Sequence, residues 1–307
     1  MNSPSRTAST RSDNHQAAGF AFGLGAYGLW GVLPIYFEAL RSVPVFAIVA
    51  HRVLWSLPLL AILVVVGGGW GKVRAAAERP RTVGMLLLTA LLIGGNWLLY
   101  IYAVTSGHIL AASFGYYLNP LANVLLGRFV LREKLSGVQW AAVAIAAAGI
   151  SVLAVGALGQ LWLSLAMCIS FALYGLLRKI VPADALTGLA IETAILFPLA
   201  VACLGWMVIA SRRVLGSSTR DTELLLLAGF VSTTPLLLFA AAARRLPYST
   251  LGMLQFLTPT LQFLIALLVY KEPVTTAHMI AFPVIWAALA LYVVAFLRAP
   301  RLPQAPE

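Results

Sequence analysis

Residues 44–66 read PVFAIVAHRVLWSLPLLAILVVV, a run in which Arg52 is the only residue with a permanent charge. A helix needs about 20 mostly apolar residues to cross the hydrocarbon core of a bilayer. This stretch is long enough at about 1.5 Å per residue. The run therefore predicts a transmembrane helix, and similar runs recur along the chain.

The composition extends this interpretation to the whole chain. Of the 307 residues, 61% are hydrophobic and 10% are charged, and the mean hydropathy is +0.92. A soluble domain carries about 25% charged residues, because most of its charge lies on the wet surface. We therefore infer an all-α integral membrane protein whose first partner is the lipid bilayer.

Charges, prolines and glycines divide the chain into two sets of five candidate spans joined by short connections. The first set covers roughly 17–40, 44–66, 82–105, 109–131 and 137–155. The second covers roughly 160–179, 186–210, 223–243, 249–270 and 275–297. We predict ten transmembrane helices, with one repeat over 17–156 and another over 157–298. The polar residues 1–16 are predicted to be a disordered cytoplasmic leader, and residues 299–307 a cytoplasmic tail.

Lysine and arginine are unequally divided between the two predicted sides of the membrane. One side holds 15 of them and the other holds five. Cytoplasmic loops carry an excess of these residues, so both termini are predicted to be cytoplasmic. A contrary cluster, Arg212, Arg213 and Arg220, lies in the longest predicted external loop.

The two halves share local sequence. A shift of 139 residues superposes Leu118-Asn119-Pro120 on Leu257-Thr258-Pro259. Shifts of 139, 140 and 147 also match Arg132-Glu133 with Lys271-Glu272, Arg52 with Glu192, and Tyr27-Gly28 with Tyr174-Gly175. Because five is odd, the second half starts on the opposite side of the membrane. The pattern predicts an inverted repeat, as in many secondary transporters, whose substrates bind where the repeats meet.

These segments resemble the EamA family of the drug/metabolite transporter superfamily, and within it the RarD-like group. The segments that carry the resemblance are AYGLWG at 26–31, HRVLWS at 51–56, IGGNWL at 93–98, GYYLNP at 115–120, IET at 191–193 and QFLTPT at 255–260. The resemblance spans roughly 19–297. It implies two five-helix repeats and export or exchange of small molecules across a bacterial inner membrane. It does not supply a substrate.

Two departures break the symmetry between the halves. Pro235 stands where the first half has Asn96, and Gln255 stands where it has Tyr116. The polar groups of the predicted cavity should therefore be asymmetric.

Arg52 and Glu192 are ionisable residues inside predicted spans. Such a group costs at least about 2.5–3.5 kcal/mol to insert and by default suggests a function. We expect Arg52 nearer the outer gate and Glu192 nearer the inner gate of an alternating-access cycle. A static structural pair and two snorkelling side chains are the alternatives, and whether the two residues pair directly is left open.

A second set of candidates places polar groups in otherwise apolar helices: Asn96, Tyr100, Tyr116, Asn119, Gln255 and Thr258. Such side chains either line a wet cavity or bond a neighbouring helix. Pro120 and Pro259 follow two of them and free carbonyl groups that could bind substrate or water. Ordinary proline kinks with hydrogen bonds between helices are the alternative.

Weaker candidates complete the predicted site. His51 could carry protons, although a structural, hydrogen-bonded histidine is the alternative. Glu38 could bind a proton or simply face water. The aromatic residues could line an organic-substrate cavity or serve as packing and interface anchors; they are Tyr27, Trp30, Trp55, Trp97 and Tyr174.

Several other functions lack a basis in the sequence. The basic residues form no stripe with aromatics, so a nucleic-acid partner is not expected. Gly23 to Gly28 fit G-x-G-x-x-G, but no strand precedes them, and Gly67 to Lys72 lack the spacing of a phosphate loop.

We expect no metal, no cofactor and no catalytic residue. A secondary transporter of small organic molecules is the leading hypothesis, with proton antiport as one coupling; a channel or uniporter and an intramembrane enzyme are the alternatives.

Overall fold

The structure is a computed structural model of the chain. It describes residues 4–298 apart from 107, 155–158, 160, 213, 217 and 272–275. All elements within these residues are helices, which are α1 Pro4–Ala39, α2 Val45–Val66, α3 Trp70–Ala77, α4 Pro80–Thr105, α5 Ile109–Phe129, α6 Gly137–Ala154, α7 Leu161–Ile180, α8 Ala185–Ile209, α9 Thr219–Ala243, α10 Tyr248–Leu254, α11 Leu257–Leu268 and α12 Thr276–Arg298. The predicted tail, the boundary between residues 156 and 157, Glu272 and Arg213 lie outside this description.

The all-α membrane fold is confirmed. Among the described residues, nine segments are long and apolar enough to cross a membrane, and one of them joins α10 and α11. The remaining long helix of the bundle, α5, is not one of the nine. The count of ten spans therefore stays a prediction.

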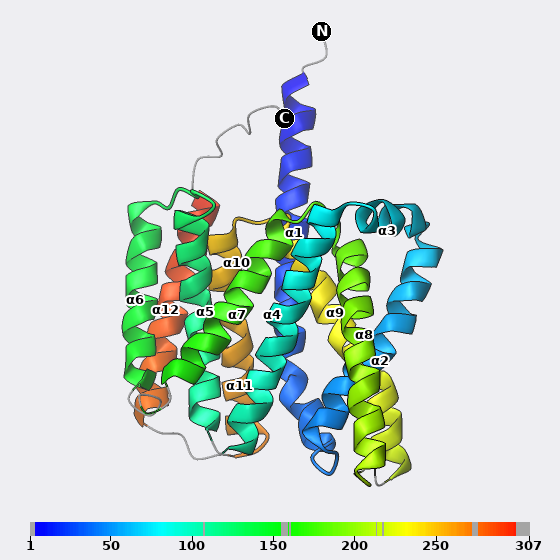
Figure 1. The fold of residues 1–307 in the computed structure, drawn as a ribbon. Helices are drawn as coiled ribbons and strands as arrows, with labels where there is room; N and C mark the ends of the chain where they lie inside the picture. The colour runs from blue at the N-terminus through cyan, green and yellow to red at the C-terminus, as the bar shows by residue number, and fades with distance from the viewer. Residues whose placement is uncertain are drawn as a thin grey trace.

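The first helix differs from the expectation for the leader. It begins at Pro4, so residues 4–16 are helical instead of disordered. Proline is well tolerated in the first turn of a helix, and no further proline or glycine occurs before Gly19. This part of α1 extends past the rest of the bundle (Figure 1).

Figure 1 shows α3 and the C-terminal end of α12 at the same end of the bundle, here called the α3 end. It is the end at which the sequence places most of the lysines and arginines. Its cytoplasmic orientation remains a prediction.

Several helix contacts in the bundle have a counterpart in which the helices of the two halves have changed places. Helix α1 packs on α9 as α7 packs on α4, and α1 packs on α11 as α7 packs on α5. Helix α2 packs on α9 as α8 packs on α4, while α2 with α8 and α6 with α12 pair across the halves. These are the relations that an inverted repeat would produce.

The ends of α5 and α11 repeat the same local geometry at an offset of 139 residues. The amides of Val130 and Leu131 bond the Leu126 carbonyl at 2.9 and 3.2 Å, and the corresponding bonds from Val269 and Tyr270 to Ile265 have the same lengths. Arg132 and Lys271 then adopt positive φ angles of 57° and 52°. The sequence offset therefore corresponds to a structural match at this helix end.

The predicted span over 249–270 is broken into α10 and α11. Pro259 has no amide hydrogen, and its ring would clash with the carbonyl four residues earlier, that of Gln255. That carbonyl instead accepts from the amide of Thr258 at 3.0 Å, which tightens the turn. Pro120 lies within the continuous helix α5.

Helix α9 crosses α2 at close range, next to Arg52. A Cβ atom on Gly229 of α9 would lie 2.3 Å from the carbonyl carbon of Trp55. The Ser56 hydroxyl also donates to the Gly229 carbonyl at 3.3 Å. Glycine therefore brings the α9 backbone directly against α2, near Arg52.

Candidate functional site

A narrow cavity of about 20 Å³, room for about one water molecule, lies between the two halves of the bundle. It is formed by α2 and α4 from the first half and by α7, α8 and α9 from the second. Its lining residues are Arg52, Val53, Ser56, Ile93, Trp97, Tyr174, Leu189, Glu192, Thr193, Leu196, Ser232, Thr233 and Leu236. Arg52 and Glu192 thus share one cavity.

Arg52 approaches the cavity from α2. Its Nε donates to the Ser232 hydroxyl of α9 at 2.8 Å. The guanidinium carbon lies 4.6 Å from the centre of the Trp97 ring and 5.8 Å from that of Phe37. Within the described part of the chain, no carboxylate lies within ion-pair distance of Arg52.

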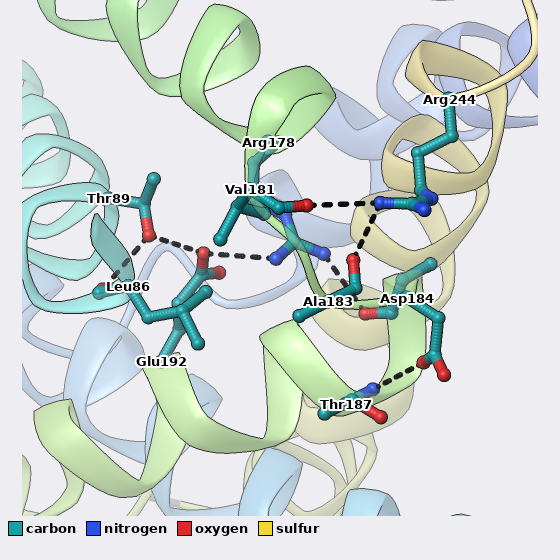
Figure 2. A network of polar contacts seen from close by, with 10 residues as sticks. Leu86, Thr89, Arg178, Val181, Ala183, Asp184, Thr187, Glu192 and Arg244 are labelled. Atoms are coloured by element: carbon teal, nitrogen blue, oxygen red, sulfur yellow. Dashed lines mark hydrogen bonds and ion pairs between the residues drawn. The ribbon is translucent and has the colours of Figure 1, made fainter. Parts of the chain in front are cut away.

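Glu192 pairs with Arg178 rather than with Arg52. Nη1 of Arg178 lies 3.4 Å from Oε1 of Glu192, and both side chains are at most 2% exposed. The same oxygen accepts from the Thr89 hydroxyl of α4 at 2.5 Å. Figure 2 shows this chain of contacts from Thr89 through Glu192 to Arg178. The question of a direct Arg52–Glu192 pair is therefore answered: the structure does not form one.

Gly188 allows Arg178 to reach its partner. It lies one turn before Glu192 on α8, and a Cβ atom there would be only 1.9 Å from Nη1 of Arg178. Nη2 of Arg178 also donates to the carbonyl of Ala185, the first residue of α8, at 3.0 Å. The Arg178 side chain therefore passes directly over Gly188 on the surface of α8.

Three lining residues have buried side-chain polar atoms that form no hydrogen bond among the described residues. These atoms are the hydroxyls of Tyr174 and Thr233 and Oε2 of Glu192, and Tyr174 and Glu192 lie close enough to interact with each other. All three residues are at most 1% exposed. Buried polar groups are nearly always satisfied, so these atoms mark a place where water or a ligand would gain hydrogen bonds.

A second polar cluster closes the connection between α7 and α8 at the α3 end (Figure 2). Arg244 at the end of α9 donates to the carbonyls of Val181 and Ala183 at 3.1 and 2.8 Å. Asp184 caps α8 by accepting from the Thr187 amide at 2.8 Å. Partial burial by itself would raise the pKa of Asp184, but this hydrogen bond and the nearby Lys72 ammonium outweigh it, so the pKa is lowered.

Three of the predicted polar candidates lie together beside the cavity. The Tyr116 hydroxyl donates to Oδ1 of Asn96 at 3.4 Å, and the rings of Tyr100 and Tyr116 are 6.2 Å apart. Nδ2 of Asn96 donates to the Met167 carbonyl and to the Ser170 hydroxyl of α7. Tyr100 and Tyr116 are close enough to Arg52 to interact with its charge. The cluster extends the polar surroundings of Arg52 along α4 and α5.

Three other candidates are placed elsewhere. Gln255 accepts from Nδ2 of Asn123 at 2.9 Å, which makes it a link between α10 and α5. The Thr258 hydroxyl donates to the Tyr27 carbonyl at 2.9 Å and joins α11 to α1. Asn119 is fully buried, and neither of its amide atoms has a hydrogen-bond partner among the described residues. None of these three lines the cavity.

Some of the weaker candidates line the cavity and others do not. Trp55 donates to Nδ1 of His51, so Nε2 carries the ring hydrogen and donates to the Val214 carbonyl at 2.8 Å. Glu38 is half-exposed and pairs with Arg41 at the end of α1. Tyr27 is buried against Trp30, outside the cavity lining. Of this group, only Trp97 and Tyr174 line the cavity.

Sequence reasoning missed Arg178, which it counted only as one of the 15 lysines and arginines on the predicted cytoplasmic side. Its position inside the predicted span 160–179 was a signal, as was the need of Glu192 for a cation at a similar depth. Thr89, Ser232 and Thr233 were also missed. Hydroxyl residues are common in transmembrane helices, and their sequence positions did not show which ones face a cavity.

Comparison with known proteins gives consistent matches. The model of the EamA-like transporter family matches residues 17–155. An uncharacterized transporter of Vibrio cholerae is 45% identical over 282 residues, which cover 92% of this chain and 93% of that protein. The protein RarD of Escherichia coli K12 is 41% identical over 283 residues, with coverage of 90% and 93%. A crystal structure of a protein with 15% identity matches the fold with a TM-score of 0.72, covering 92% of this chain and all of the other.

Proposed function

This chain belongs to the EamA-like transporter family, and we propose that it is a gradient-driven transporter that exports or exchanges small organic molecules by alternating access. It is a multi-pass protein of a bacterial inner membrane. The observation that carries the proposal is the cavity between the halves, which contains a partly exposed arginine without a counter-ion among the described residues and the buried polar groups of Tyr174, Thr233 and Glu192.

The position of the cavity supports a transport role. Both halves contribute helices to its wall, and their packing relations exchange between the halves. In transporters built from inverted repeats, substrate binds at the interface of the repeats and one repeat rocks against the other. A cavity at this interface is therefore placed to face either side in turn.

Two polar links join the halves at different depths. Arg52 of the first half bonds Ser232 of the second, and Thr89 of the first half bonds Glu192 of the second. Both Arg52 and Glu192 lie seven residues into their helices, about 10 Å of rise, but from opposite ends of the bundle. In the proposed cycle, separation of the Thr89–Glu192 link opens the α3 end, and separation of the Arg52–Ser232 link opens the other.

Glu192 is the proposed coupling residue for proton exchange. Oε1 is occupied by Arg178 and Thr89, whereas Oε2 forms no hydrogen bond among the described residues, although Tyr174 lies close enough to interact with Glu192. A proton on this carboxyl would weaken its ion pair and thereby favour opening of the α3 end. Substrate and proton would then use the same cavity at different stages of the cycle.

The test starts from purified protein screened by thermal shift against neutral, cationic and anionic organic molecules. Compounds that raise the melting temperature are then followed in proteoliposomes with and without an imposed proton gradient. We expect saturable flux that responds to the gradient. Linear flux without saturation would indicate a channel, chemical conversion of the compound would indicate an enzyme, and saturable flux that ignores the gradient would remove antiport only.

Substitutions of cavity residues test whether the flux passes through this cavity. Arg52→Gln and Glu192→Gln should each reduce flux by tenfold or more, on the order expected for a lost charge-assisted contact. Arg74→Gln is the matched control, because that arginine pairs with Glu78 on the exposed surface of α3. Near-normal flux in both cavity variants, with normal folding, would refute the assigned site.

A further inference from the structure

The charges around the cavity do not balance. Glu192 is neutralised by Arg178 in a buried ion pair, whereas Arg52 has no carboxylate within ion-pair distance among the described residues. The cavity and its surroundings therefore keep one net positive charge. An uncompensated charge inside the membrane is costly, and a mobile anion would compensate it.

The guanidinium of Arg52 keeps its two terminal nitrogens available. Among the described residues, the guanidinium forms its hydrogen bond through Nε, which donates to the Ser232 hydroxyl and anchors the side chain between α2 and α9. The Trp97 ring provides a cation–π contact at 4.6 Å that fixes the plane of the group from one side. Arginine held in this manner presents a rigid pair of N–H donors that match the two oxygens of a carboxylate.

We propose that the cavity selects organic monocarboxylates, whose carboxylate group becomes the counter-ion of Arg52. This inference rests on the proposed transport function and names its substrate class. One negative charge neutralises the site, whereas a phosphate ester with two charges would leave an excess negative charge in a low-dielectric cavity beside Glu192. A cation would be repelled by Arg52.

The walls of the cavity define the rest of the ligand. Ile93, Leu189, Leu196 and Leu236 supply apolar surface, and Trp97 supplies an aromatic face. The hydroxyls of Tyr174, beside Glu192, and of Thr233 can bond a hydroxyl or carbonyl substituent. The cavity of about 20 Å³ is too small for an organic carboxylate in this conformation. The expected ligand, a small carboxylate with an aromatic or aliphatic body, therefore enters when one end of the bundle opens.

The experiment measures binding to the full-length protein in detergent, by calorimetry and thermal shift at constant ionic strength. The probes are benzoate, phenylpyruvate and hexanoate, with benzamide as the neutral isostere of benzoate and phenyl phosphate as the dianion. We expect at least one monocarboxylate to bind saturably and to raise the melting temperature. Benzamide should bind about tenfold or more weakly because it has no charge to pair with Arg52, and phenyl phosphate because its second negative charge stays unbalanced.

Variants identify Arg52 as the anion-binding group. Arg52→Gln should weaken carboxylate binding by about tenfold or more, and Arg52→Lys by less, because lysine retains the charge but not the paired donors. Ser232→Ala, which loosens the guanidinium without removing it, keeps the test informative if Arg52→Gln fails to fold. Arg74→Gln should bind as the wild type does. Absence of binding by all three carboxylates, or equal binding to folded Arg52→Gln, would overturn the proposal.

The substrate class and the transport function can fail separately. Carboxylate binding that depends on Arg52 without any flux in proteoliposomes would uphold the binding site and refute transport of these compounds. Saturable flux of neutral or cationic molecules that benzoate does not inhibit would uphold transport and refute the carboxylate class.

Discussion

The guanidinium of Arg178 lies 3.4 Å from the carboxylate of Glu192, and neither side chain is more than 2% exposed. The pair joins α7 to α8, and Thr89 extends it to α4 in the other half of the molecule. It therefore combines two tasks. It holds the helices of the second half together and balances the only carboxylate that lines the cavity among the described residues.

Removal of Arg178 should strongly destabilise the protein. Arg178→Met would leave the Glu192 carboxylate buried without a counter-ion, at an expected cost of about 3–5 kcal/mol. The double variant Arg178→Met/Glu192→Gln should recover most of this loss, because no unpaired charge remains. Melting temperatures in one detergent measure both effects. Arg74→Met is the control for an exposed pair, where the expected change is about 0–1 kcal/mol. Equal instability of the single and double variants would contradict the charge argument.

Gly188→Ala should displace the same ion pair without changing any charge. The new Cβ atom would lie 1.9 Å from Nη1 of Arg178, and we expect a loss of about 1–3 kcal/mol from this overpacking. Gly95→Ala is the matched control on α4, since no heavy atom lies within 4 Å of its Cβ position. That change should be neutral or stabilising by up to about 1 kcal/mol through helix propensity. Equal melting temperatures of the two variants would contradict the proposed close approach.

Asp184 should stabilise α8 in a pH-dependent manner. Its pKa is lowered in the folded protein, so its contribution is present above the unfolded value of about 4 and is lost as the pH falls through the lower folded value. At pH 7, Asp184→Ala should cost about 1 kcal/mol through loss of the helix cap. The carboxyl is 41% exposed, so its contact with Lys72 adds little.

The measurement is the difference in melting temperature between wild type and Asp184→Ala from pH 7 to pH 3. This difference should be constant between pH 6 and 8 and should shrink at the acidic end. Asp184→Asn keeps a side-chain oxygen that can cap the helix and should show a smaller effect. A difference that stays the same at pH 3 and pH 7 would show that ionisation of Asp184 does not matter.

Asn119 and Asn123 should respond in opposite directions to replacement by leucine. Asn119 is fully buried and has no partner for either amide atom, so Asn119→Leu should be neutral or stabilising by about 1 kcal/mol. Asn123 bonds Gln255 and Tyr248, and Asn123→Leu should cost about 1–3 kcal/mol. Melting temperature and flux are measured together. A strong loss of flux in a stable Asn119→Leu protein would instead assign Asn119 to the transport path.

The sequence by itself determined the class of fold. Apolar runs such as 44–66 have the length of a bilayer and hardly any charge, so their placement in lipid follows from solvation alone. The 139-residue offset also emerged from the sequence, and the matching ends of α5 and α11 give it a structural counterpart. The position of Arg52 and Glu192 inside predicted spans was also evident, although only Glu192 is fully buried in the structure.

The partners of these charges were decided by the tertiary structure. A helix sequence specifies which residues share a face but not which neighbouring helix that face meets. Arg178 lies near the end of its span, where a side chain could equally reach water. It is buried because α7 crosses α8 at Gly188, where the absence of a Cβ atom leaves room for the guanidinium. Glu192 therefore pairs with Arg178, and Arg52 is left with an unbalanced charge that only the packed bundle reveals.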